Sequence, residues 1–221
     1  MKLITNLILI HLKNSFRNPQ KLLYLMFFSF LIVVIFAFSF DLSPKLLNKV
    51  TPGIIWSVII LGSTGILSES FKEESDNFLF YRFLLSPISI TTLVITRTLS
   101  NMLIILTWEF FIIFLTFIFL NFNTDFNIYY FILTIVTGSI GYVILTTFFS
   151  VIVSGSKNIL MSIIIYPLIL PLLMGVLKMT SLIFLNTIND QFFFWLKIVI
   201  GFDIIYLSII IILTEIVFES D

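Results

Sequence analysis

The chain of 221 residues contains no cysteine, one histidine and few charged side chains. Without cysteine there are no disulfides, thiolate metal sites or thiol catalysis. A single histidine, His11, cannot build a multi-histidine metal site. Charged residues are only 11% of the chain, and the 12 basic residues equal the 12 acidic ones. The charge balance therefore excludes the basic footprint of a nucleic-acid-binding protein.

The sequence also has none of the common catalytic motifs. It contains no GxxxxGK[ST] phosphate loop, no HExxH zinc motif and no G-x-S-x-G nucleophile elbow. We therefore expect no enzymatic activity. Any energy for work must come from a partner protein or from an ion gradient.

Apolar residues dominate what is present. They make up 59% of the chain, and the mean hydropathy is +1.16, whereas soluble domains are about 45–50% apolar. A helix needs ~20 apolar residues to cross a bilayer, because its backbone amides must be satisfied internally. The sequence predicts one all-α, polytopic membrane domain with six transmembrane helices. The predicted spans are 22–40, 52–68, 99–120, 128–153, 159–177 and 192–218.

Proline and glycine bear on the second and sixth predicted spans. Pro52 suits the first turn of the second span. The sixth span is long enough to tilt, or to break near Gly201.

Eight of the 12 Lys and Arg residues fall on the cytoplasmic side if the N-terminus is inside, against four on the other side. This bias predicts that both termini are cytoplasmic.

Residues 1–18 are too polar to span a bilayer, but apolar residues recur at helical spacing from Leu3 to Leu12. This pattern predicts an amphipathic helix at the membrane interface. A cleaved signal peptide is disfavoured, because no small-residue cleavage site follows the apolar run. We expect His11 to be a solvated surface histidine on this helix.

The segment 69–87 begins with the polar run ESFKEESDN and continues with the apolar run FLFYRFLLSP. It is interpreted in two ways: as a solvated loop leading into the third span, or as a short cytoplasmic helix that another protein binds.

Two acids, Glu109 and Asp203, fall inside predicted spans. An ionisable side chain at that depth is costly and is a candidate for function. The alternative is that each faces the bundle, protonated or hydrogen-bonded to a neighbour such as Thr107 or Tyr206. A break at Gly201 would instead bring Asp203 to the outer surface.

Pro167 and Pro171 lie four residues apart in the fifth span. Together they remove two backbone donors from one helix face, so this helix is expected to kink or partly unwind. The bend is either structural or a flexible element beside a pathway.

Two blocks of sequence resemble the CcmB family, the membrane subunit of the ABC transporter called the haem exporter, which serves cytochrome c maturation. The first block holds PGIIW at 52–56, SFKEE at 70–74 and LLSP at 84–87. The second, SKNILMSIIIYPLILPLL, matches the family's proline and leucine positions, Pro167 and Pro171 among them. The chain departs from the family at 107–110, which reads TWEF where relatives often carry a Gly-Leu-Pro turn.

The resemblance implies a type-2 ABC exporter permease with an interfacial N-terminal helix and a coupling helix between spans two and three. A separate CcmA-like ATPase subunit would bind that coupling helix. The implied contact residues are Phe71, Glu74, Phe78, Leu79 and Tyr81. The implied further partners are CcmC- and CcmD-like membrane proteins, a CcmE-like haem chaperone and a second permease copy.

The resemblance also implies where cofactors are handled. Haem would be handled by the complex and ATP by the partner, so this chain itself binds no cofactor. It would reside in the bacterial inner membrane, or in the mitochondrial inner membrane if organelle-encoded. Whether haem is translocated, or a haem-loaded chaperone is released, stays open.

Two other classes of protein are compatible with the sequence. One is a type-2 ABC permease for a lipid, drug or polysaccharide. The other is an ion-coupled or respiratory-complex membrane subunit, in which Glu109 and Asp203 would carry protons.

Overall fold

The computed structural model describes residues 2–17, 19–39, 44–76, 90–122, 125–155 and 159–219, together with most of their side chains. All regular structure in these ranges is helical, which confirms the predicted all-α class. The helices are α1 (Lys2–Arg17), α2 (Pro19–Ser39), α3 (Pro44–Asp76), α5 (Ile90–Phe119), α6 (Ile128–Gly155), α7 (Ile159–Phe184) and α8 (Asp190–Glu219).

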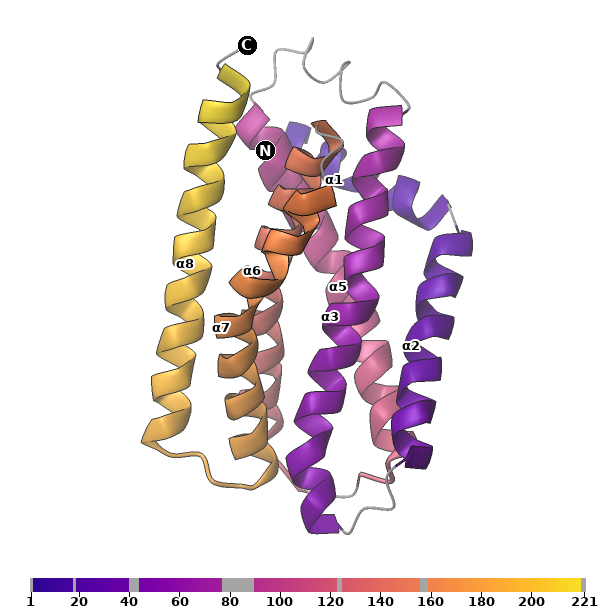
Figure 1. Cartoon of the computed structure of the whole chain (residues 1–221), viewed down its shortest axis with the longest axis vertical. Helices are drawn as coiled ribbons and strands as arrows, with labels where there is room; N and C mark the ends of the chain where they lie inside the picture. The colour runs from indigo at the N-terminus through magenta and orange to yellow at the C-terminus, as the bar shows by residue number, and fades with distance from the viewer. Residues whose placement is uncertain are drawn as a thin grey trace.

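The six longer helices run alternately up and down in one bundle, and α1 lies across one end (Figure 1). The C-terminal end of α8 is at the same end as α1, and the α7–α8 connection is at the opposite end. Helix α6 is central, since it packs against α3, α5, α7 and α8. Helix α1 packs mainly on α5.

Asparagines define the helix ends at the pole away from α1. Asn127 caps the start of α6, its Oδ1 accepting from the Tyr129 amide at 3.1 Å. Asn121 and Asn186, just past α5 and α7, have φ angles of 48° and 54°, the left-handed conformation that ends many helices. The Asn186 side chain also donates to the Asp125 carbonyl at 2.6 Å, which ties the two loops together.

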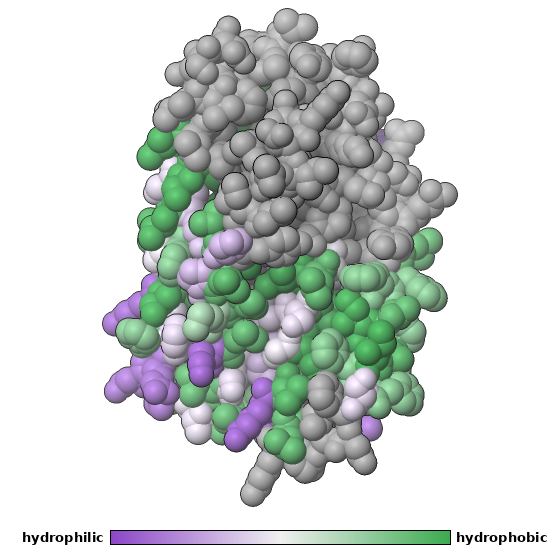
Figure 2. All heavy atoms as spheres, in the orientation of Figure 1, coloured by the Kyte–Doolittle hydropathy of each residue, from purple (hydrophilic) through white to green (hydrophobic). Residues whose placement is uncertain are grey.

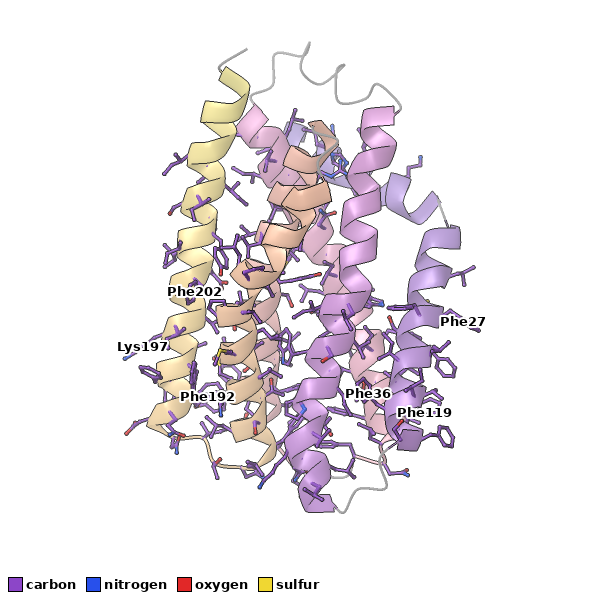
Figure 3. All side chains as sticks on the ribbon, viewed as in Figure 1. Phe27, Phe36, Phe119, Phe192, Lys197 and Phe202 are labelled. Carbon is purple, nitrogen blue, oxygen red and sulfur yellow. The ribbon has the colours of Figure 1, made fainter. Side chains whose placement is uncertain are left out.

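The outside of the bundle is apolar. Among the described residues, four segments are long and apolar enough to cross a membrane: 91–119, 128–147, 167–184 and 190–212. Phe27 is 71% exposed, and Figure 3 shows it pointing away from α2. In Figure 2 the described surface is mostly apolar, with hydrophilic residues gathered near the start of α8. Such a surface suits a lipid environment and confirms a membrane protein.

The second bundle helix begins at Pro44, so the expectation that Pro52 lies in its first turn is wrong. Helix α7 stays helical through Pro167 and Pro171, so it does not unwind there, whereas a kink at these prolines stays a prediction. Helix α8 passes through Gly201, so the alternative of a break at that residue is wrong. Packing against neighbouring helices holds these segments helical where local sequence alone favours an end or a break.

Candidate functional site in the core of the bundle

The centre of the bundle contains a set of polar groups arranged around one stretch of α6. Three residues of α6, one of α5 and two of α8 contribute, and carbonyls of α3 and α7 accept from the two tyrosines. We call this set the α6 polar layer: Glu109, Ser139, Gly141, Tyr142, Asp203 and Tyr206. Polar groups at this depth must find partners within the protein, because lipid offers none.

Glu109 of α5 faces Ser139 of α6 and is completely buried. The Ser139 Oγ lies 2.8 Å and 2.7 Å from the two carboxyl oxygens of Glu109. The same hydroxyl is 2.7 Å from the Ile135 carbonyl oxygen. A hydroxyl has one proton, so Ser139 donates to one of these oxygens at a time. This contact links α5 to α6 through an acid that faces the protein interior.

Asp203 of α8 lies on another side of α6 and is 7% exposed. Its carboxyl group is placed against the backbone of Gly141, and the Leu172 side chain touches the same point. A β-carbon at Gly141 would collide with both side chains, so glycine is required for this approach. Among the described residues, Asp203 Oδ1 has no hydrogen-bond partner.

Two tyrosine hydroxyls complete the layer by bonding to helix carbonyls. Tyr142 of α6 donates to the Ile60 carbonyl of α3 at 3.2 Å. Tyr206 of α8 donates to the Leu168 carbonyl of α7 at 2.6 Å. The layer therefore connects α6 to α3 and α5, and α8 to α6 and α7, through side chains that lie far apart in sequence.

A second polar cluster joins α1 to the bundle. His11 is only 8% exposed and Arg97 of α5 only 6%. Burial and, to a lesser extent, the nearby positive charge of Arg97 together lower the pKa of His11 to about 4. One turn along α5, Asn101 donates to Thr147 of α6 at 3.0 Å. The expectation of a solvated His11 is wrong, because α1 turns its Leu7 and His11 face toward α5.

The predicted acids do face the bundle, but with other partners than expected. Thr107 donates to the Leu103 carbonyl, not to Glu109. Asp203 is not carried to the outer surface, since α8 is unbroken. Sequence reasoning missed Ser139 and Gly141, because a lone serine or glycine in an apolar helix carries no signal of what lies opposite.

Most of the residues expected to contact the ATPase lie outside the part of the chain that the structure describes. Phe78, Leu79 and Tyr81 lie outside the described residues. Phe71 and Glu74 fall within the last turns of α3, which runs to Asp76, but the structure does not describe their side chains. The proposed cytoplasmic contact is therefore not tested by the structure.

Chemically, the polar groups of the described interior hold the helices together through hydrogen bonds. Within the part of the chain that the structure describes, no group of three or more His, Cys, Asp or Glu side chains could hold a metal ion. The polar contacts join helices pairwise, so a change in packing between two helices would break and remake a small number of hydrogen bonds.

The fold and these interior contacts define a polytopic, all-helical membrane protein. Comparison with known proteins identifies its family. The CcmB protein family matches residues 2–214, nearly the whole chain, and the chain belongs to that family.

Curated relatives are more distant. The chain is 22% identical over 95 residues to "Heme exporter protein B" of Escherichia coli (strain K12), and equally similar to the protein of that name from Shigella flexneri. The aligned region is 43% of this chain and 43% of each relative, so the chain spans less than half the length of these relatives.

Proposed function

We propose that this chain is the membrane-embedded permease subunit of an ABC transporter that serves haem export, or release of a haem-loaded chaperone, in c-type cytochrome biogenesis. Its membership of the CcmB family over residues 2–214 carries the proposal. The relatives named heme exporter protein B support it, at low identity. A separate subunit supplies ATP hydrolysis, because the sequence has no phosphate-binding loop.

All six long helices cross the membrane in this proposal, with both termini on the cytoplasmic or matrix side of an inner membrane. The placement of α1 and the end of α8 at the same pole of the bundle supports an even number of crossings (Figure 1). The excess of Lys and Arg in the sequence segments that this proposal places on that side supports its cytoplasmic orientation. Helix α1 then lies at the cytoplasmic interface, held to α5 by the buried His11 and Arg97.

The ATPase binds the segment that follows the bundle part of α3. Helix α3 continues to Asp76, well beyond the predicted end of the span at residue 68. A helical extension of this kind is suited to transmit force from a cytoplasmic subunit to the bundle. We propose Phe71, Glu74, Phe78, Leu79 and Tyr81 as the contact residues. Further partners are CcmC- and CcmD-like proteins, a CcmE-like chaperone and a second permease copy.

Haem itself is handled by other members of the complex. The single histidine of this chain, His11, is buried next to the positive charge of Arg97. A haem ligand needs a ring nitrogen that an iron atom can reach. We therefore propose that this subunit contributes movement and not haem ligands.

Affinity purification tests the proposal directly. The tagged chain is purified in mild detergent as wild type, as Phe78→Asp and as Leu79→Asp. Phe78→Leu and Leu79→Ile are the matched controls, because they keep an apolar side chain at the same positions. We expect a small ATPase to co-purify with the wild type and both controls. The aspartate variants should lose it, since a charge is costly in an apolar contact. A wild-type chain that brings down no ATPase would refute the proposal.

Burial of two acids within the bundle favours one alternative, an ion-coupled membrane subunit. That alternative predicts that Glu109→Gln abolishes function, because glutamine cannot carry a proton. The permease proposal predicts a mild effect, because a glutamine side chain still bonds to Ser139. Activity of the Glu109→Gln variant in a strain lacking its own copy distinguishes the two.

A further inference from the structure

The proline-bearing turn of α7 is supported from outside by α8. Pro171 has no amide hydrogen, and its ring crowds the carbonyl of the residue four positions earlier, Pro167. Within a bilayer, backbone groups disturbed in this way depend on neighbouring helices for partners. The Tyr206 hydroxyl of α8 contacts this turn, since it donates to the carbonyl of Leu168, the residue after Pro167, at 2.6 Å. Tyr206 is 3% exposed, so the donor of this bond is buried within the protein.

The same part of α8 also contacts α6. Asp203, three residues before Tyr206, lies against Gly141 of α6, and the Leu172 side chain of α7 reaches the same point. Further along the antiparallel pair, Gly175 of α7 faces Val199 of α8. This contact is seven residues from the Leu168–Tyr206 contact on each helix, so the two helices keep one register over two turns.

We propose that Tyr206 is a positioning residue that fastens the proline-bearing turn of α7 to α8, so that the two helices move as one unit during the transport cycle. This inference rests on the proposed function for its cycle, but the fastening itself is a property of the chain. Without the hydroxyl, α7 flexes at its prolines, and movement that begins at the ATPase is not passed on through α8.

The absence of cysteine allows the fastening to be measured by disulfide formation. A β-carbon at Gly175 lies 3.9 Å from the Val199 β-carbon, within the range of about 3.5–4.5 Å that disulfides adopt. It would also lie 2.5 Å from Val199 Cγ2, an atom that Val199→Cys removes. The pair Gly175→Cys with Val199→Cys therefore reports whether α7 and α8 keep their register.

The first measurement is the rate of disulfide formation in purified full-length chain. We expect Tyr206→Phe to slow it about fivefold, the factor that one net hydrogen bond contributes. Pro171→Ala should remove most of that effect, because the alanine amide restores the helical hydrogen bond to the Pro167 carbonyl, so this turn of α7 depends less on α8. Tyr129→Phe is the control, since Tyr129 is exposed and distant from the prolines. An unchanged rate in Tyr206→Phe, or no relief by Pro171→Ala, would overturn the proposal.

The second measurement uses ATP hydrolysis by the purified complex. We expect Tyr206→Phe to lower the rate about fivefold. The oxidised disulfide should leave the wild-type rate unchanged and restore the Tyr206→Phe rate, and a reductant should reverse the restoration. A disulfide that inhibits the wild type would show that α7 and α8 must separate, which contradicts the proposal.

The two measurements separate the inference from the proposed function. If no ATPase accompanies the wild-type chain, the proposed function fails, while the disulfide rates still decide whether Tyr206 fastens α7. If the ATPase is present and the disulfide rates do not respond to Tyr206→Phe, the inference fails alone.

Discussion

Two glycines inside helices provide a test of the packing, because the same substitution should destabilise the protein at one position and not at the other. A β-carbon at Gly138 of α6 would lie 2.5 Å from Trp56 Cη2 and 2.6 Å from Val176 Cγ1. At Gly201 of α8 there is no atom within 4 Å of the added carbon. We therefore compare Gly138→Ala with Gly201→Ala.

The magnitude follows from the surroundings of Trp56. To reach an ordinary contact distance, the ring or α6 must move by about 1 Å, and a well-packed core resists such shifts at a cost of about 1–3 kcal/mol. The Trp56 Nε1 donates to Thr180 Oγ1 at 3.0 Å, and moving the ring weakens that bond, worth about 1 kcal/mol. Alanine regains up to about 1 kcal/mol in helix propensity. The net expected loss for Gly138→Ala is about 2 kcal/mol.

Thermal unfolding in detergent, followed by tryptophan fluorescence, measures both variants. Gly138→Ala should lower the midpoint by about 4–8 °C, using about 2–4 °C per kcal/mol for a chain of this size. Gly201→Ala should leave it unchanged or raise it slightly. Equal midpoints for the two variants would show that α3, α6 and α7 are not packed as described.

Three further perturbations have defined outcomes. Ser139→Ala should destabilise the protein by about 1–3 kcal/mol, because it leaves the buried Glu109 carboxyl without its partner. Glu109→Gln should destabilise the protein less than Ser139→Ala. Unfolding of both variants in detergent compares the two losses. Acidification should weaken the attachment of α1. The pKa of His11 is about 4 in the folded state and 6.5 ordinarily, so the folded state binds fewer protons than the unfolded state. The free energy of unfolding should therefore fall by up to about 3 kcal/mol as the pH is lowered from 6.5 to 4. His11→Gln should remove this part of the pH dependence, measured as the difference between the two pH profiles. Asn127→Ala should cost about 1 kcal/mol by removing the cap of α6, which unfolding in detergent measures.

The sequence alone was sufficient for the class of protein and for most helices. Hydropathy over some 20 residues is a local property, and it placed the predicted spans close to α2, α5, α6, α7 and α8. The motif at 52–56 and the proline block pointed to the CcmB family, which the comparison confirms over residues 2–214. The amphipathic pattern of residues 1–18 predicted α1 almost to the residue.

The tertiary structure alone decided which polar side chains meet. Ser139 is 30 residues from Glu109, and Gly141 is 62 residues from Asp203, so no local pattern in the sequence connects either pair. His11 shows the same limit, because its environment depends on which face of α1 packs against Arg97. Helix continuity at Pro52 and Gly201 also depends on packing, since neighbouring helices stabilise segments that local propensity would end. A helix in lipid is predictable from its own residues, whereas the burial and partners of its polar side chains are properties of the assembled bundle.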